Sequence, residues 1–116
     1  MKYYYKGQLI RTSKNVYSHA VVAEGENGKI WNYGCSSRLD LAQKNLNGII
    51  SNEQKAVNQT KNALNKMKAG VKDTWYAREY TIEQVEGFLK SHEARLDWYQ
   101  KNLKVVELEV KGFKLN

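Results

Sequence analysis

The chain has 116 residues, which suits one domain and is too short for two. Hydrophobic residues make up 41% and charged residues 27% of it, a balance typical of a folded globular protein and not of a disordered one. The formal net charge is +7, and the single cysteine, Cys35, excludes a disulfide framework and a site of several thiolates.

The first 35 residues predict an antiparallel β-sheet made of two hairpins. Two short β runs, at residues 3–5 and 8–12, flank a turn at Gly7. Residues 16–23 and 29–33 form a second pair of β runs around a turn that contains two glycines. We expect the two hairpins to share one sheet with a strand from the end of the chain.

A long helix is predicted at residues 37–70. Its start, Ser37-Arg38-Leu39-Asp40, resembles a capping box, and apolar residues then recur with helical spacing. Glu53 and Thr60 interrupt this apolar stripe where a coiled coil would be hydrophobic. Gly70 is a natural stop, because glycine readily adopts the left-handed conformation that ends helices.

The second half of the chain predicts another helix and a last strand. Residues 71–81 connect the helices, and the capping box Thr81-Ile82-Glu83-Gln84 starts a helix at residues 82–103, antiparallel to the first. The Val-rich segment at residues 104–113 predicts a strand that joins the N-terminal sheet. The sequence therefore predicts an α+β fold in a single domain over residues 1–116.

The length of the first helix argues for assembly. A helix of about 32 residues would be ~48 Å long, whereas a domain of this size has a radius of gyration near ~13 Å. Its apolar stripe would extend beyond the core of one chain, so we expect a second chain to cover it in a homo-oligomer built through the helices. A bend near Gly48 or Glu53 is the alternative, because glycine weakens a helix interior.

Positive charge is concentrated in the first 70 residues, where eleven Lys and Arg face four acidic residues, while residues 71–116 carry eight of each. A nucleotide, a nucleic acid or an acidic protein would suit this surface, and a lysine-rich surface that only favours solubility is the alternative. The sequence also has no apolar run that resembles a secretory signal or approaches the ~20 residues of a membrane span. We therefore expect a cytoplasmic protein with no membrane partner.

The sequence contains no recognisable catalytic motif. Gly25-Glu26-Asn27-Gly28 is short, acidic and followed by a strand, which suits a hairpin turn and not a phosphate-binding loop. Cys35 could pair with His19 or His92, but an inert cysteine is the better interpretation. His92 lies on the apolar face of the second helix, where packing is commoner than a functional role. We expect no enzyme activity, no cofactor and no metal.

The connection between the helices is rich in aromatic residues, although such loops usually carry small polar ones. Trp75 and Tyr76 could stack on a base, and Arg78 could form a bidentate contact with a phosphate. These three residues are the first candidate ligand-binding set. The alternative is that the rings plug the open end of the helical pair.

A second candidate set lies at the end of the first hairpin. Arg11, Thr12 and Ser13 offer a cation and two hydroxyls, and Lys14 adds a second cation. Such groups bind phosphate oxygens at strand ends. A plain polar turn is the commoner explanation for the same residues.

The segments Tyr3-Tyr4-Tyr5-Lys6-Gly7-Gln8-Leu9-Ile10-Arg11-Thr12-Ser13, Val16-Tyr17-Ser18-His19-Ala20 and Gly34-Cys35-Ser36-Ser37, followed by two long helices, resemble the phage Thoeris anti-defence protein family, type 1. The resemblance implies a non-enzymatic homo-oligomer in the cytoplasm of the phage's host. Such proteins sequester cyclic ADP-ribose isomers made by bacterial immune enzymes, and some also sequester cyclic oligonucleotides. An aromatic ring stacks on the adenine, and Arg and amide side chains hold the phosphates and riboses. Trp75, Tyr76 and Arg78 have the residue types of such a site.

Two other functions remain open. A small basic phage protein could bind nucleic acid or inhibit a host nuclease by direct contact, although four arginines and no recognition-helix motif are weak signals for DNA binding. A structural oligomerisation module is the other, and it would bury the aromatic residues between the helices. The acidic surface of a DNA mimic is absent from this basic chain.

Overall fold

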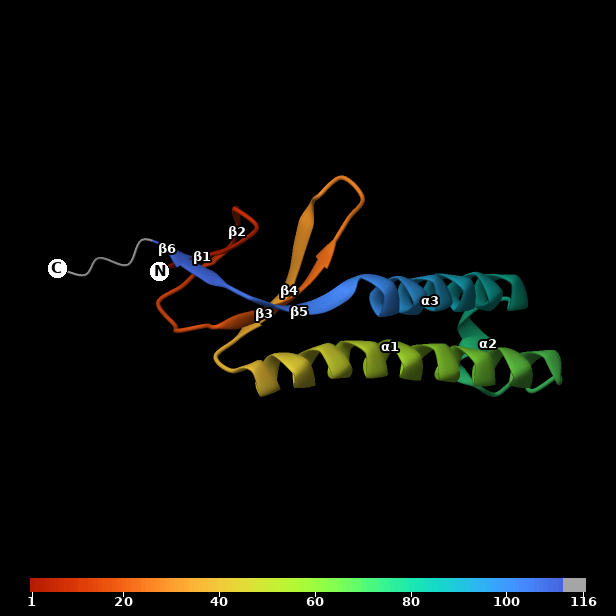
Figure 1. Cartoon of the computed structure of the whole chain (residues 1–116). Helices are drawn as coiled ribbons and strands as arrows, with labels where there is room; N and C mark the ends of the chain where they lie inside the picture. Colours follow the sequence, from red (N-terminus) through yellow and green to blue (C-terminus); the bar gives the residue numbers. More distant parts are fainter. Residues whose placement is uncertain (112–116) are drawn as a thin grey trace. The chain divides into compact units, whose positions relative to one another are not determined.

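The computed structural model describes residues 1–111 (Figure 1). Six strands and three helices follow in the order β1 (Lys2–Tyr5), β2 (Gln8–Thr12), β3 (His19–Glu24), β4 (Ile30–Ser36), α1 (Leu39–Lys68), α2 (Trp75–Glu79), α3 (Ile82–Asn102), β5 (Leu103–Glu107) and β6 (Glu109–Lys111). The α+β class is as predicted from the sequence.

The chain forms two compact units. The sheet unit contains residues 1–49 and the chain from residue 101 onward, and the helical unit contains residues 50–100. Both boundaries fall inside a long helix, one in α1 and the other in α3. The organisation as a single domain stays a prediction.

The strands form two sheets, so the prediction of one shared sheet is wrong. One sheet has the order β2-β1-β6 and the other β4-β3-β5, and all pairs are antiparallel. The predicted last strand is two strands, separated at Leu108, and each half pairs with a different hairpin. Each hairpin therefore completes its own three-stranded sheet. Residues 112 and 113 of the predicted strand 104–113 lie outside the described residues.

Glycine turns close both hairpins. Lys6 and Gly7 have φ values of 48° and 76°, the left-handed pair that matches the twist of a two-residue hairpin. In the second hairpin the Gly28 N–H donates to the Gly25 carbonyl at 3.0 Å, and Gly28 has a φ of 78°. Glycine takes this conformation without the Cβ clash of other residues.

The core of the sheet unit lies on both faces of β3. Val22 packs with Ala20 of β3 and Val106 of β5, and Tyr5 and Leu108 contact this cluster. Val21 and Ala23 alternate with these residues and are also fully buried. A strand that is buried on both faces has a continuous apolar sequence, and in β3 this sequence covers residues 20–23.

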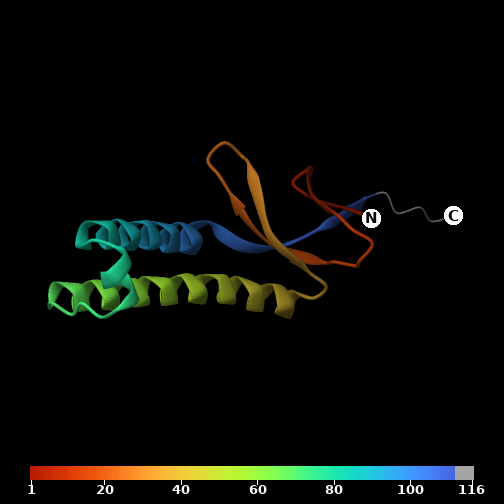
Figure 2. The ribbon, with the colours of Figure 1, turned by 180° about the vertical axis from the view of Figure 1, so that it is seen from behind.

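In the helical unit the two long helices run side by side and antiparallel, with α2 in the connection between them (Figures 1 and 2). Val57 and Leu64 of α1 and Val85 of α3 are its buried apolar side chains of largest size. No helix in the part of the chain that is described has the length and apolarity to cross a membrane.

Local sequence signals set the ends of both long helices. The Thr81 N–H donates to Gln84 Oε1 at 2.8 Å, and the Gln84 N–H donates to Thr81 Oγ1 at 3.2 Å, which confirms the second capping box. At the end of α1, Gly70 has a φ of 86°, and the Val71 N–H donates to the Lys66 carbonyl at 3.0 Å. α1 begins at Leu39, two residues later than predicted.

Candidate functional site

Four aromatic side chains of the helical unit form an aromatic cluster: Trp75 and Tyr76 of α2, Tyr80 in the connection, and Phe88 of α3. The centroid of the Trp75 ring lies 5.2 Å from that of Tyr76 and 5.5 Å from that of Tyr80. In both pairs the two ring planes are nearly perpendicular. Tyr80 meets Phe88 in the same way at 4.9 Å. Edge-to-face contacts at these distances are favourable, so each ring supports its neighbour.

The short helix α2 places the predicted residues on one turn. The Thr74 hydroxyl accepts a hydrogen bond from the Ala77 N–H at 3.2 Å, as an N-cap does, and the Tyr80 N–H donates to the Tyr76 carbonyl at 2.9 Å. Residues three apart on a helix share a face. Trp75 and Arg78 therefore lie on the same face of α2.

The aromatic cluster is open to solvent at Trp75. Its side chain is 58% exposed, and α2 has no buried residue. Tyr76 and Tyr80 are half-buried. A ring deep in a core would be inaccessible to a ligand, whereas more than half of the Trp75 side chain is accessible to solvent.

The Arg78 guanidinium lies beside the start of α2. Its Nε donates to the Thr74 carbonyl and its Nη2 to the Asp73 carbonyl, both at 3.4 Å. These contacts are long, and their acceptors are neutral, so they hold the guanidinium more weakly than a carboxylate would. Arg78 is exposed, and a phosphate could replace both carbonyls.

Arg11, Thr12 and Ser13 belong to the sheet unit, and so to a different unit from Trp75. The Arg11 guanidinium stacks on the Tyr17 ring, 5.1 Å from its centroid. Ser13 Oγ accepts a hydrogen bond from the Asn15 N–H at 3.1 Å, in the segment that follows β2. Thr12 is exposed at the end of β2.

Tyr17 is a site residue that the sequence did not single out. The Asn15 amide donates to the Tyr17 hydroxyl at 3.3 Å. This hydrogen bond, the Ser13 hydroxyl and the positive charge of Arg11 lower the pKa of Tyr17. The Tyr17 N–H in turn donates to the Tyr3 hydroxyl at 3.0 Å. Its position next to Arg11 depends on the loop between β2 and β3, which no local pattern predicts.

Cys35 has the surroundings of a structural cysteine. Partial burial raises the pKa of the Cys35 thiol, while the nearby Arg11 charge acts in the opposite direction. Its Sγ lies 3.9 Å from Asn32 Oδ1. A raised pKa leaves the group as a thiol near neutral pH, which is the less reactive form.

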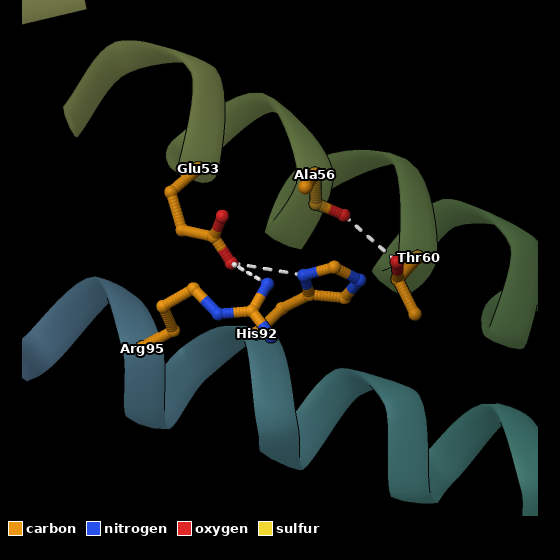
Figure 3. Close-up of polar contacts among 5 residues, drawn as sticks. All are labelled: Glu53, Ala56, Thr60, His92 and Arg95. Carbon is orange, nitrogen blue, oxygen red and sulfur yellow. Dashed lines mark hydrogen bonds and ion pairs between the residues drawn. The ribbon is translucent and has the colours of Figure 1, made fainter. Parts of the chain in front are cut away.

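His92 makes a polar contact between the two long helices (Figure 3). Its Nδ1 lies 2.9 Å from Glu53 Oε1, and Arg95 Nη1 lies 3.5 Å from the same oxygen. The Glu53 side chain is only 12% exposed. Both partners of the carboxylate come from α3, so this contact joins α1 to α3.

Thr60 occupies the other polar position of the α1 stripe (Figure 3). The residue is 2% exposed, and its hydroxyl donates to the Ala56 carbonyl at 2.8 Å. Both interruptions of the apolar stripe are thus satisfied by hydrogen bonds. They have a structural explanation that requires no ligand.

Comparison of the chain with protein-family models, with curated proteins and with solved structures gave no match. Among residues 1–111, no group of three or more His, Cys, Asp and Glu side chains could hold a metal ion.

Proposed function

We propose that the protein binds a small nucleotide at the aromatic cluster and sequesters it without chemical change. The observation that carries this proposal is the exposed Trp75 ring, in T-shaped contact with Tyr76 and Tyr80, on the same helix face as Arg78. A base would stack on Trp75, and a phosphate would meet the Arg78 guanidinium. Stacking and a charge-assisted hydrogen bond are complementary forces for a nucleotide.

The cluster suits binding because its main ring is already supported. A ligand that stacks on Trp75 need not order a free side chain, and pre-organisation of this kind lowers the entropic cost of binding. The Arg78 N–H groups would exchange two long contacts with neutral carbonyls for shorter bonds to a charged oxygen.

The resemblance to the phage Thoeris anti-defence family, type 1, supplies the ligand class. In that role the protein would act in the cytoplasm of the host cell and hold cyclic ADP-ribose isomers, with cyclic oligonucleotides as a further class. Sequestration needs no nucleophile. The raised pKa of Cys35, which keeps the thiol protonated near neutral pH, is consistent with binding without a cysteine nucleophile.

Assembly through the helices is part of the proposal. α1 is an uninterrupted helix of 30 residues, ~45 Å long at 1.5 Å per residue. Gly48 and Glu53 lie inside it, so the helix does not end at either of them. Phe88, Val71 and Leu41 are partly exposed apolar side chains on or beside the long helices, and a second copy would cover such groups.

Alanine substitution of Trp75, Tyr76 and Arg78 tests the site. We expect Trp75→Ala to weaken binding of a cyclic ADP-ribose isomer by about 1–3 kcal/mol, because it removes the stacked ring. Arg78→Ala should weaken binding strongly and leave the melting temperature unchanged, because exposed arginines contribute little to folding. Isothermal titration calorimetry and thermal unfolding should be measured on the same samples.

Trp31→Ala and Arg38→Ala are matched controls, because they remove a tryptophan and an arginine from the sheet unit. Both should bind the nucleotide at wild-type affinity. If Trp75→Ala instead lowers the free energy of unfolding by about 3–5 kcal/mol, the ring is a core plug. Full affinity and normal melting in all three site variants would remove this segment from the site.

Nucleic-acid binding, or direct inhibition of a host nuclease, is the second candidate function. The observation that favours a nucleic acid is the charge of the sheet unit. Over the whole sequence, residues 1–49 and 101–116 carry eleven Lys and Arg against five Asp and Glu, whereas residues 50–100 carry eight against seven. Six of the seven excess positive charges thus belong to the sheet unit.

A further inference from the structure

Aromatic rings of the sheet unit lie beside cations. Lys111 Nζ lies 4.8 Å from the Tyr4 ring centroid, and Lys29 Nζ lies 5.4 Å from that of Trp31. Arg11 lies over Tyr17 in the same manner. In the helical unit, by contrast, the rings of the aromatic cluster contact one another. A ring next to a cation is the arrangement with which proteins bind single-stranded nucleic acids, because a base stacks while its phosphate meets the charge.

One of these pairs lies on a sheet face whose other residues are exposed, while its ring, Tyr4, is half-buried. In the sheet β2-β1-β6, Lys2 is opposite Thr12 on one side and Lys111 on the other, and Tyr4 is opposite Leu9 and Glu109. Residues opposite each other in a sheet point to the same side, and so do residues two apart along a regular strand. The β1–β2 pairing shifts register between Tyr3 and Tyr4, so that Thr12 and Leu9, three apart on β2, lie opposite Lys2 and Tyr4. We name the resulting surface the open face; its members are Lys2, Tyr4, Leu9, Thr12, Glu109 and Lys111.

On the opposite side of this sheet the middle residue is buried, whereas its cross-strand neighbours Arg11 and Val110 are exposed. Tyr3 lies between Lys2 and Tyr4 on β1 and is fully buried. Leu9, by contrast, is 54% exposed beside Tyr4. The open face thus has one row with the Tyr4 ring, Leu9 and the acid Glu109, and a neighbouring row with Lys2 and Lys111. The strands β1 and β6 lie side by side in Figure 1.

We propose that the open face binds a single-stranded nucleic acid. A base stacks on Tyr4 and rests against Leu9, the Lys2 and Lys111 ammonium groups contact the flanking phosphates, and the Thr12 hydroxyl adds a hydrogen bond. The partner is single-stranded because the bases of a duplex are already stacked on one another and cannot reach a ring on a flat sheet. This inference does not depend on the nucleotide site at Trp75, which belongs to the other unit.

The ammonium group of Lys111 does not prevent stacking. An exposed cation–ring contact changes an equilibrium by about 2- to 5-fold, whereas stacking of one base on an aromatic side chain is worth about 5- to 150-fold. The base therefore displaces the ammonium from the ring. The flexible lysine side chain then carries the charge to the phosphate.

Fluorescence anisotropy with a labelled 12-nucleotide oligothymidylate tests the proposal. Tyr4→Leu should weaken binding about 10-fold, and Tyr4→Phe should restore it, because phenylalanine keeps the ring and loses only the hydroxyl. Lys2→Gln combined with Lys111→Gln should lower the magnitude of the log–log salt slope by about 1.4, at roughly 0.7 for each phosphate contact in a single strand.

Lys55→Gln combined with Lys61→Gln is the matched control, because it removes the same charge from exposed lysines of the helical unit. This variant should keep the wild-type salt slope. A 12-base-pair duplex should bind more weakly than the single strand and be indifferent to Tyr4→Leu. Circular dichroism melting of each variant shows that the fold is intact.

Three results would overturn the proposal. The first is wild-type affinity for the oligonucleotide in folded Tyr4→Leu. The second is an equal loss of affinity in the Lys55/Lys61 control, which would mean a general response to net charge. The third is the absence of measurable binding by the wild-type protein at low salt. The outcome is separate from that of the proposed nucleotide site, because the substitutions Tyr4→Leu, Lys2→Gln and Lys111→Gln all lie in the sheet unit, whereas Trp75 and Arg78 belong to the helical unit.

Discussion

At the scale of single residues, Glu24 joins three segments of the sheet unit. Its carboxylate lies 2.7 Å from Lys6 Nζ, in the turn between β1 and β2, and 2.6 Å from Lys104 Nζ on β5. The two lysines also flank the Tyr5 ring, at 5.5 and 5.6 Å from its centroid. One acid at the end of β3 thus connects a strand of one sheet with the hairpin of the other.

This arrangement predicts a pH dependence of folding. Hydrogen bonds from Lys104 and Lys6 lower the pKa of Glu24 below its ordinary value of 4.5. A carboxyl group with a lowered pKa stabilises the fold above its unfolded pKa, and that contribution is lost as the pH falls through the folded pKa. We expect Glu24→Gln to melt below the wild type at pH 7, and the two melting curves to converge below about pH 4.5.

Glu26→Gln is the control for this prediction, because Glu26 is an exposed acid two residues away in the same turn. Its melting temperature should follow that of the wild type at both pH values. A difference between Glu24→Gln and the wild type that persists unchanged at pH 3 would contradict the role assigned to the carboxylate.

At the scale of secondary-structure elements, Gly48 inside α1 and Gly70 just beyond its end should respond to alanine with opposite signs. Gly70 has a φ of 86° after the last turn, where a Cβ is strained, so Gly70→Ala should destabilise the protein by about 1 kcal/mol. Gly48 lies inside the helix, and an added Cβ there would meet no atom within 4 Å. Gly48→Ala should therefore stabilise it by about 1 kcal/mol.

Urea unfolding of both variants measures the two changes, and each serves as the control for the other because the substitution is the same. Equal effects of the same sign would contradict the helix end described for Gly70. The comparison also examines the continuity of α1, since a bend at Gly48 would abolish the gain expected from alanine.

Helix ends and hairpin turns could be predicted because their causes are local. The Thr81 and Gln84 side chains and the φ of Gly70 act within a few residues of each end. The division into two sheets could not be predicted, because it depends on where β5 and β6 pair. His19 pairs with Glu107, and Tyr3 with Val110, and a sequence pattern does not reveal such distant partners.

The candidate site shows the same division between local and distant causes. The aromatic composition of the connector was visible in the sequence, and so was the presence of Arg78. That Trp75 remains exposed and that Phe88 of α3 completes the cluster depend on how α2 and α3 pack. The exposed fraction of Trp75 could not be predicted from the sequence.

At the scale of the whole molecule, the two units carry surfaces of different chemistry. The helical unit is nearly neutral and carries the aromatic cluster, and the sheet unit holds most of the excess positive charge and carries the open face. The proposed nucleotide site and the proposed single-strand site can therefore be tested separately, by different substitutions and by the salt dependence of binding. The proposed assembly through the helices would mainly involve the helical unit.

The central claim is that the protein holds a small nucleotide intact. Native mass spectrometry of protein purified from cells that make nucleotide immune signals, followed by denaturation and analysis of the released molecule, tests it most directly. We predict an assembly of at least two chains that carries bound nucleotide, and release of that nucleotide with its original mass and structure. A ligand-free protein, or a released molecule that has been cleaved or otherwise converted, would contradict the account.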